Sequence, residues 1–113
     1  SIMENPEAAL KATPMEGTRY VAITTGMDQP GMMLAISSFM AEHNINIEDW
    51  STVLDGAHVT HVVYVTFHAP CTDLKTVQAQ FKQAMTEAGF TAQLCHEDIF
   101  RATGEIAPIK TIL

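Results

Sequence analysis

The stretch "TTGMDQPGMMLAISSFMAEHNINIED", residues 24–49, combines three local patterns in close succession. Its β-branched start completes a run from Arg19 that is typical of a buried strand, and helical apolar spacing follows from Met32. Pro30 suits the first turn of a helix, and Asn44 suits the left-handed conformation that ends one. The stretch therefore predicts a strand, a tight corner, a helix and the start of a second strand.

Two further strand patterns follow this stretch. They cover residues 45–54 and 58–67 and are joined by Asp55-Gly56, a pair that favours a two-residue hairpin turn. We therefore expect the two strands to form an antiparallel hairpin.

A second helix and a closing strand complete the pattern. Apolar residues between Leu74 and Ala88 recur at i, i+3, i+4 and i+7, with Thr72 as the expected N-cap and Gly89 just past the end. The pattern of residues 91–100 predicts a short closing strand that runs to Phe100. The order β-α-β-β-α-β indicates an α+β fold, the ferredoxin-like sandwich, in which a four-stranded antiparallel sheet carries both helices on one face.

The length and composition of the chain fit one packed domain. It has 113 residues, of which 47% are hydrophobic and 17% are charged. We expect the domain to cover residues 19–102, with an N-terminal arm or linker over 1–18 and a C-terminal tail over 103–113. Because the chain begins with Ser1 and not with Met, it is also interpretable as a piece of a longer protein.

The charge balance excludes some partners. Lys and Arg number 6 and Asp and Glu number 13, so the formal net charge is −7, which repels phosphate backbones. We therefore expect no direct nucleic-acid partner. No apolar run approaches the roughly 20 residues that cross a bilayer, and the start lacks a signal pattern, so we expect a cytoplasmic protein without a membrane partner. Cys71 and Cys95 make no disulfide framework, and Cys71 is interpreted as a loop thiol.

Alternation along residues 58–67 assigns the side chains to two faces. His61 and Val63 belong to the set expected to face the core, whereas Val62 and Tyr64 belong to the opposite set. Because both helices cover one face, we expect the second face to be used for contact, by a partner subunit or by the N-terminal arm.

The corner between the first strand and the first helix is the candidate binding site. Gly31 lets the amides of the first helical turn approach a ligand, and the positive end of the helix dipole suits a carboxylate. The alternative is purely structural: Asp28 caps the helix and Pro30-Gly31 makes a tight turn. The residues of the corner leave both interpretations open.

Several segments together resemble the ACT domain family. They are the first strand, "GMDQPGMMLAISSFMAEHNINIED", the hairpin "DGAHVTHVVYVTF", the helix after Thr72 and the closing "HEDIFRA". The resemblance covers residues 19–102. The closing "EDIF" is similar to the branch that includes glycine-cleavage repressors and formyltetrahydrofolate deformylases.

The resemblance implies a regulatory module that binds a free amino acid or a similar metabolite, usually where two such domains meet. It implies that Asp28 and the backbone of the corner frame the ligand, and that the start of the second strand borders it. The ligand-binding residues implied are Asp28, Gln29, Pro30, Gly31, Met32, Asn44, Asn46 and Ile47.

Other polar residues give weaker alternatives. His58 and His61 differ by an odd number and so point to opposite faces, which argues against a metal site built on that pair. His43 is expected to contact the carbonyls at the end of the first helix. Trp50 is interpreted as packing on the sheet, with a ligand wall or interface anchor as the alternative. No nucleophile with an evident base and no phosphate-binding glycine motif is present, so we expect no catalysis and no cofactor.

The sequence therefore predicts a non-catalytic, amino-acid-binding module that forms a homodimer. Two other hypotheses stay open. One is a protein-interaction domain with an empty pocket, suggested by Val62 and Tyr64. The other is a regulatory fragment of a larger metabolic enzyme, suggested by Ser1.

Overall fold

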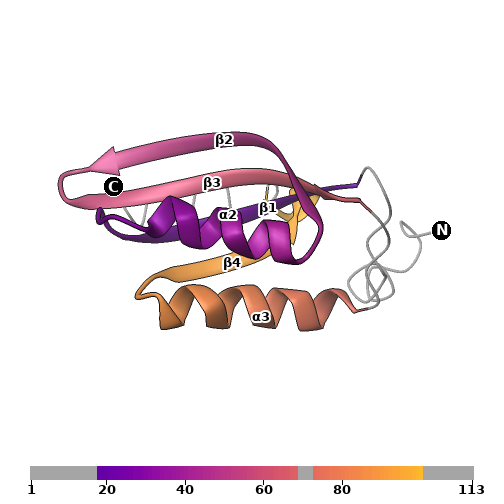
Figure 1. Ribbon diagram of the computed structural model, residues 1–113. Coiled ribbons are helices and arrows are strands. Elements are labelled where there is room, and N and C mark those ends of the chain that lie inside the picture. Colours follow the sequence, from indigo (N-terminus) through magenta and orange to yellow (C-terminus); the bar gives the residue numbers. More distant parts are fainter. Residues whose placement is uncertain (1–17, 69–72, 101–113) are drawn as a thin grey trace.

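A computed structural model describes residues 18–68 and 73–100 (Figure 1). Strands and helices follow one another in the predicted order, with one short helical turn added at the end. The elements are β1 (Arg19–Met27), α2 (Met32–Glu42), β2 (Ile45–Asp55), β3 (His58–Phe67), α3 (Leu74–Glu87), β4 (Thr91–His96) and α4 (Glu97–Ile99).

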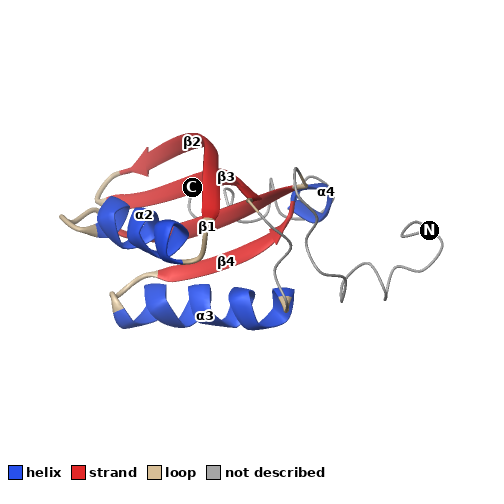
Figure 2. Ribbon diagram, turned by 45° about the vertical axis from the view of Figure 1, so that its right-hand side comes forward, coloured by secondary structure: helices blue, strands red, loops and turns tan. Residues whose placement is uncertain are grey.

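The four strands form one antiparallel sheet in the order β2-β3-β1-β4. β1 and β3 are the central strands, and β2 and β4 are the edges. Both long helices, α2 and α3, pack on the same face of this sheet (Figure 2). The structure confirms the predicted ferredoxin-like sandwich. No helix in the two described ranges is long and apolar enough to span a bilayer.

The main core lies between the sheet and the two helices. Ile36 and Met40 of α2 and Phe81 and Met85 of α3 are at most 1% exposed, and each pair is four residues apart. Side chains with this spacing share one helix face, so the two apolar stripes cover the sheet. Full burial of one such side chain contributes about 1.5–3 kcal/mol, which makes these stripes a main source of stability.

The end of the chain differs from the prediction. Residues 91–100 were expected to form one strand, but β4 ends at His96 and residues 97–99 turn into α4. His96 Nδ1 accepts a hydrogen bond from the Asp98 amide at 3.0 Å, which caps the turn. Glu97 and Asp98 lie in its first turn, where the helix dipole favours acidic side chains. A local capping interaction therefore ends the strand early.

The beginning of α3 also differs in detail. Thr72, the predicted N-cap, lies outside the described residues, and Asp73 occupies the N-cap position. The Asp73 carboxylate accepts from the Lys75 amide at 3.1 Å and from the Thr76 hydroxyl at 2.5 Å. The bond from Thr76 is the main cause that lowers the pKa of Asp73.

The end of α2 is as predicted. Asn44 has a φ of 54°, the left-handed conformation that ends a helix. His43 Nδ1 lies 2.9 Å from the Phe39 carbonyl oxygen, and the two rings stack with centroids 3.9 Å apart. The predicted contact of His43 with the helix end is therefore confirmed.

The helix-free face of the sheet has a small core of its own. Val21, Ile23 and Val62 pack with Phe100, which follows α4, and Tyr64 packs against this cluster. Val62 is only 6% exposed. Val62 itself is therefore covered, because the short helical turn places Phe100 on that face. The use of this face for contact with a partner subunit or with the N-terminal arm stays a prediction.

Two buried threonines give a matched test of the core. Thr24 and Thr60 are both fully buried, but Thr60 Oγ1 shares a hydrogen bond with Thr25 Oγ1 at 3.0 Å, whereas Thr24 Oγ1 has no hydrogen-bond partner in the described part of the chain. Thr24→Val should raise the free energy of unfolding by about 1 kcal/mol, because a sealed, unpaired hydroxyl is costly. Thr60→Val should lower it by a similar amount. Urea unfolding measures both, and a change of the same sign in both variants would contradict this account.

Candidate functional site

The corner before α2 is built around Gly31. Its φ of 95° is a left-handed conformation that favours glycine, and it occupies the N-cap position without any side-chain cap. The Gly31 carbonyl accepts the first helical hydrogen bond, from the Ala35 amide at 2.8 Å. The interpretation of Asp28 as the helix cap is therefore wrong, because the helix begins three residues later than that interpretation requires. Pro30 lies in the turn just before α2.

The backbone of Asp28 has a different partner, the hairpin between β2 and β3. Its amide donates to the Ala57 carbonyl at 2.8 Å. Asp55 pairs directly with His58, so the two turn residues are Gly56 and Ala57, one position later than predicted. Gly56 has a φ of 61°. This bond holds the corner against the hairpin.

A pocket of about 340 Å³ lies between the corner and the helix-side face of β2 and β3. The corner and the first turn of α2 contribute residues 28–33. The two strands contribute Thr52, Leu54, Val59 and His61. Thr52 pairs with His61 and Leu54 pairs with Val59 in the β2–β3 register, so these four side chains form two adjacent rows on one face.

His61 is the buried polar residue of this pocket and is only 5% exposed. Its Nδ1 accepts from the Trp50 indole Nε1 at 2.9 Å and lies 3.2 Å from Thr52 Oγ1. The Trp50 and His61 rings meet edge to face, with centroids 5.4 Å apart. Burial lowers the pKa of His61, and the nearby negative charge of Asp28 opposes this effect. The pocket therefore combines an acidic group with a neutral imidazole.

The structure separates the predicted ligand-binding residues into two groups. Asp28, Gln29, Pro30, Gly31 and Met32 all line the pocket. Asn44, Asn46 and Ile47 lie at the opposite end of α2 and the start of β2. The 11 residues of α2 span about 16 Å, so a single copy of the chain does not bring both groups onto one small ligand.

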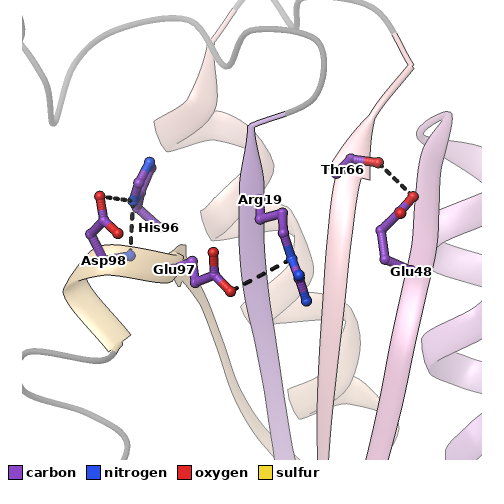
Figure 3. A network of polar contacts seen from close by, with 6 residues as sticks. All are labelled: Arg19, Glu48, Thr66, His96, Glu97 and Asp98. Atoms are coloured by element: carbon purple, nitrogen blue, oxygen red, sulfur yellow. Dashed lines mark hydrogen bonds and ion pairs between the residues drawn. The ribbon is translucent and has the colours of Figure 1, made fainter.

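The residues at the start of β2 are engaged in contacts away from the pocket. Ile47 packs against the main core, and Asn46 lies on the opposite face of β2. The side-chain amide of Asn46 donates to Glu48 Oε2, which also accepts from the Thr66 hydroxyl at 3.0 Å. Figure 3 shows Glu48 and Thr66 together at this end of the sheet, near an ion pair in which Arg19 Nε is 3.5 Å from Glu97 Oε2.

The strand residues of the pocket were missed as site residues. His61 was correctly predicted to face the core side, but not to border the corner. The signal that could have found it is the hairpin register, which places Thr52 directly across from His61. Trp50 packs on the sheet as expected, but its hydrogen bond to His61 was not anticipated. In residues 18–68 and 73–100, no three His, Cys, Asp or Glu side chains group as a metal site.

Comparison with known proteins identifies the family. No protein-family model matches the chain. A UPF0237 protein of Methanopyrus kandleri is 34% identical over 85 residues, which cover 75% of this chain and 94% of that protein. The chain belongs to the UPF0237 family. A UPF0237 protein of Corynebacterium glutamicum is 30% identical over 86 residues, which cover 76% of this chain and 97% of that protein.

Solved structures show that this UPF0237 chain has the ACT-domain fold. An ACT domain protein from Streptococcus pneumoniae matches with a TM-score of 0.66 at 19% identity, over 74% of this chain and 93% of that chain. A formyltetrahydrofolate deformylase from Burkholderia mallei matches with a TM-score of 0.58 at 11% identity, over 70% of this chain and 28% of that longer chain. A protein assigned as a glycine cleavage system transcriptional repressor matches with a TM-score of 0.59 at 16% identity, over 68% of this chain and 45% of that chain. The resemblance found in the sequence is thus confirmed for the fold.

The lowered pKa of His61 predicts how the stability of this UPF0237 domain depends on pH. The ordinary pKa of about 6.5 holds in the unfolded chain, and burial lowers it in the folded protein. As the pH falls below about 6.5, the unfolded state takes up a proton that the folded state resists, so the free energy of unfolding should fall. The drop continues until the pH passes the folded pKa.

His61→Asn is the matched variant for this measurement, because it keeps an acceptor for the Trp50 indole and removes the titrating group. Urea unfolding followed between about pH 7.5 and 5 should show a shallower loss of stability in this variant. Parallel curves for the two proteins would contradict the assignment.

Proposed function

We propose that this UPF0237 protein is a non-catalytic regulatory domain that binds a free amino acid in the pocket between the corner and the hairpin. The observation that carries the proposal is the composition of that pocket. It joins the start of α2, the acidic Asp28 and the buried His61 around a single cavity of about 340 Å³.

The start of α2 suits the carboxylate of such a ligand. The first amides of a helix have no partner within the helix, and the dipole favours a negative group there. Gly31 has no side chain, and beyond its two chain neighbours no atom of the described structure lies within 4 Å of where its Cβ would be, so the approach is open. Asp28 offers a negative charge to the ammonium group of the same ligand.

The size and the lining suit a small ligand. The cavity is near the lower end of the range of about 300–1,000 Å³ for ligand pockets. Met33, Leu54 and Val59 add apolar surface beside the polar groups. A free amino acid with a modest side chain matches both features.

The contacts of His61 favour binding over catalysis. Asp28, His61 and Thr52 resemble the acid, base and hydroxyl of a hydrolase, but the Nδ1 lone pair that faces Thr52 already accepts from the Trp50 indole. An indole N–H only donates, so this nitrogen is not free to take the Thr52 proton. We therefore propose no catalytic step.

A second copy of the chain would complete the site in this proposal. Asn46 and Ile47 lie too far from Asp28 within one subunit, and β2 is an edge strand, paired in the described part only with β3. In a twofold dimer, the start of β2 from one subunit would border the corner of its partner. Ligand binding would then stabilise one arrangement of the two subunits, which is how such a domain regulates.

A second candidate function rests on the rim of the pocket. Met27, Met33, Leu34 and Leu54 are large apolar side chains that are 52% to 69% exposed, near the same corner and hairpin. Apolar residues gathered in this way favour contact with a protein. An interaction domain would use this rim, in place of the buried Val62 face.

A thermal-shift screen of the protein amino acids tests the first proposal. A ligand at 100 times its Kd adds about 2.7 kcal/mol, which raises the Tm of a small domain by several degrees. Asp28→Asn should abolish that shift, because the ammonium group loses its partner. Glu87→Gln is the matched control, since Glu87 is an exposed acid at the end of α3, and it should keep the shift. An equal loss in both variants, or no shift with any amino acid, would contradict the proposal.

Mixing two variants tests the shared site. Asp28→Asn and Asn46→Ala should each bind no ligand alone. In a random mixture of twofold dimers, half are mixed and each mixed dimer keeps one intact site of two, so about a quarter of the sites should recover. No recovery in a mixture shown to exchange subunits would place the whole site within one subunit.

A further inference from the structure

We infer that His61 is a ligand-binding residue of this pocket, and that its Nε2–H donates to the carboxylate of a zwitterionic α-amino acid whose ammonium group lies against Asp28. The inference rests on the proposed function and specifies the ligand and the residue that selects it.

The hydrogen bond from Trp50 fixes where the imidazole carries its proton. The indole Nε1–H donates and never accepts, so His61 Nδ1 must accept at the 2.9 Å separation. The single proton of the neutral ring is therefore on Nε2. Thr52 Oγ1 lies 3.2 Å from the same Nδ1, whose single lone pair already accepts from the indole. The Trp50 indole thus holds the tautomer.

The protonated nitrogen has no hydrogen-bond partner among the described residues. His61 lines the cavity although it is 95% buried, given its 5% exposure. In the described ranges, Thr24 Oγ1 is the one fully buried polar side-chain atom without a hydrogen-bond partner. His61 Nε2 also lacks a partner there but is not fully buried, so it keeps some exposure. Nε2 is therefore an accessible donor without a protein acceptor, on an otherwise buried ring. A ligand acceptor would satisfy it.

The charges of the lining select the ligand class. Asp28 and His61 are the two titratable residues that line the pocket, and neither a Lys nor an Arg is among the lining residues. With His61 neutral, the site carries one negative charge. A phosphate ester or a dicarboxylate would bring further negative charge without a cation to receive it. A zwitterion matches, because its ammonium offsets Asp28 and its carboxylate accepts from Nε2–H.

The apolar lining limits which amino-acid side chains the pocket favours. Met33, Leu54 and Val59 lie along the cavity, and the volume is small. These surfaces favour a neutral, apolar side chain. L-alanine, L-valine and L-methionine are therefore the probes, each compared with its own primary amide, which keeps the ammonium group and lacks the carboxylate charge.

Isothermal titration of the full chain with these pairs tests the inference. A charge-assisted hydrogen bond is roughly twice as strong as a neutral one, so the wild-type protein should bind the acid at least about 10-fold more tightly than the amide. In His61→Asn the shorter side chain keeps an acceptor for Trp50 but does not reach the pocket, and this preference should fall at least about threefold. His61→Gln, which restores a donor near the position of Nε2, should recover part of it.

Trp50→Phe provides a second variant that leaves His61 in place. It removes the donor that fixes the tautomer, so acid binding should weaken and the ¹⁵N shifts of the His61 ring should move toward the Nδ1–H form. Tight acid binding with the same acid-to-amide preference in wild type, His61→Asn and Trp50→Phe would overturn the inference while leaving the proposed function intact. No binding of any amino acid to the wild-type chain would overturn both.

Discussion

The hydrogen bond from the Asp28 amide to the Ala57 carbonyl links two parts of the chain on which the candidate site depends. Asp28 follows the last residue of β1, and Ala57 is in the turn between β2 and β3. One neutral backbone hydrogen bond adds only about 1 kcal/mol to stability. Its larger effect is positional, because it sets the start of α2 over the rows of side chains on β2 and β3. The cavity exists because these two parts are held at a fixed separation.

The polar contacts beside this bond interrupt an otherwise apolar layer. Trp50, Thr52 and His61 share the helix-side face with the core, where side chains such as Val63 and Val65 are fully buried. A buried imidazole is costly unless its nitrogens are paired, and here only Nδ1 has partners in the described structure. Such departures from the apolar pattern are expected where a protein binds or reacts. The same departure places a buried imidazole at the wall of the pocket.

Local patterns made most of the fold predictable. The positive φ at Asn44, the apolar stripe of α3 and the alternation along β3 follow from residues close together in the sequence, and all three agree with the structure. The early end of β4 was not foreseen, because a cap from His96 competes locally with strand pairing. Phe100 then covers a face that the strand pattern alone left open.

The site was harder to predict because it depends on distances between elements. The five corner residues line one pocket, but the length of α2 separates them from Asn46. A family motif in the sequence does not reveal this separation in space. His61 was assigned to the correct face, yet its role needs both the strand register and the docking of the corner. Strand register follows from the hairpin turn, and that turn lies one residue later than the Asp-Gly pair indicated.

The central claim is that the cavity between the corner and the hairpin binds a free amino acid. The most direct measurement is a titration of ¹⁵N-labelled protein with individual amino acids, followed by the backbone and imidazole resonances. An amino acid with an apolar side chain should give saturable shifts at Asp28, Gly31, Thr52 and His61. Resonances that stay fixed with every amino acid, or shifts that appear only around Tyr64 and Phe100 on the helix-free face, would contradict binding in this cavity.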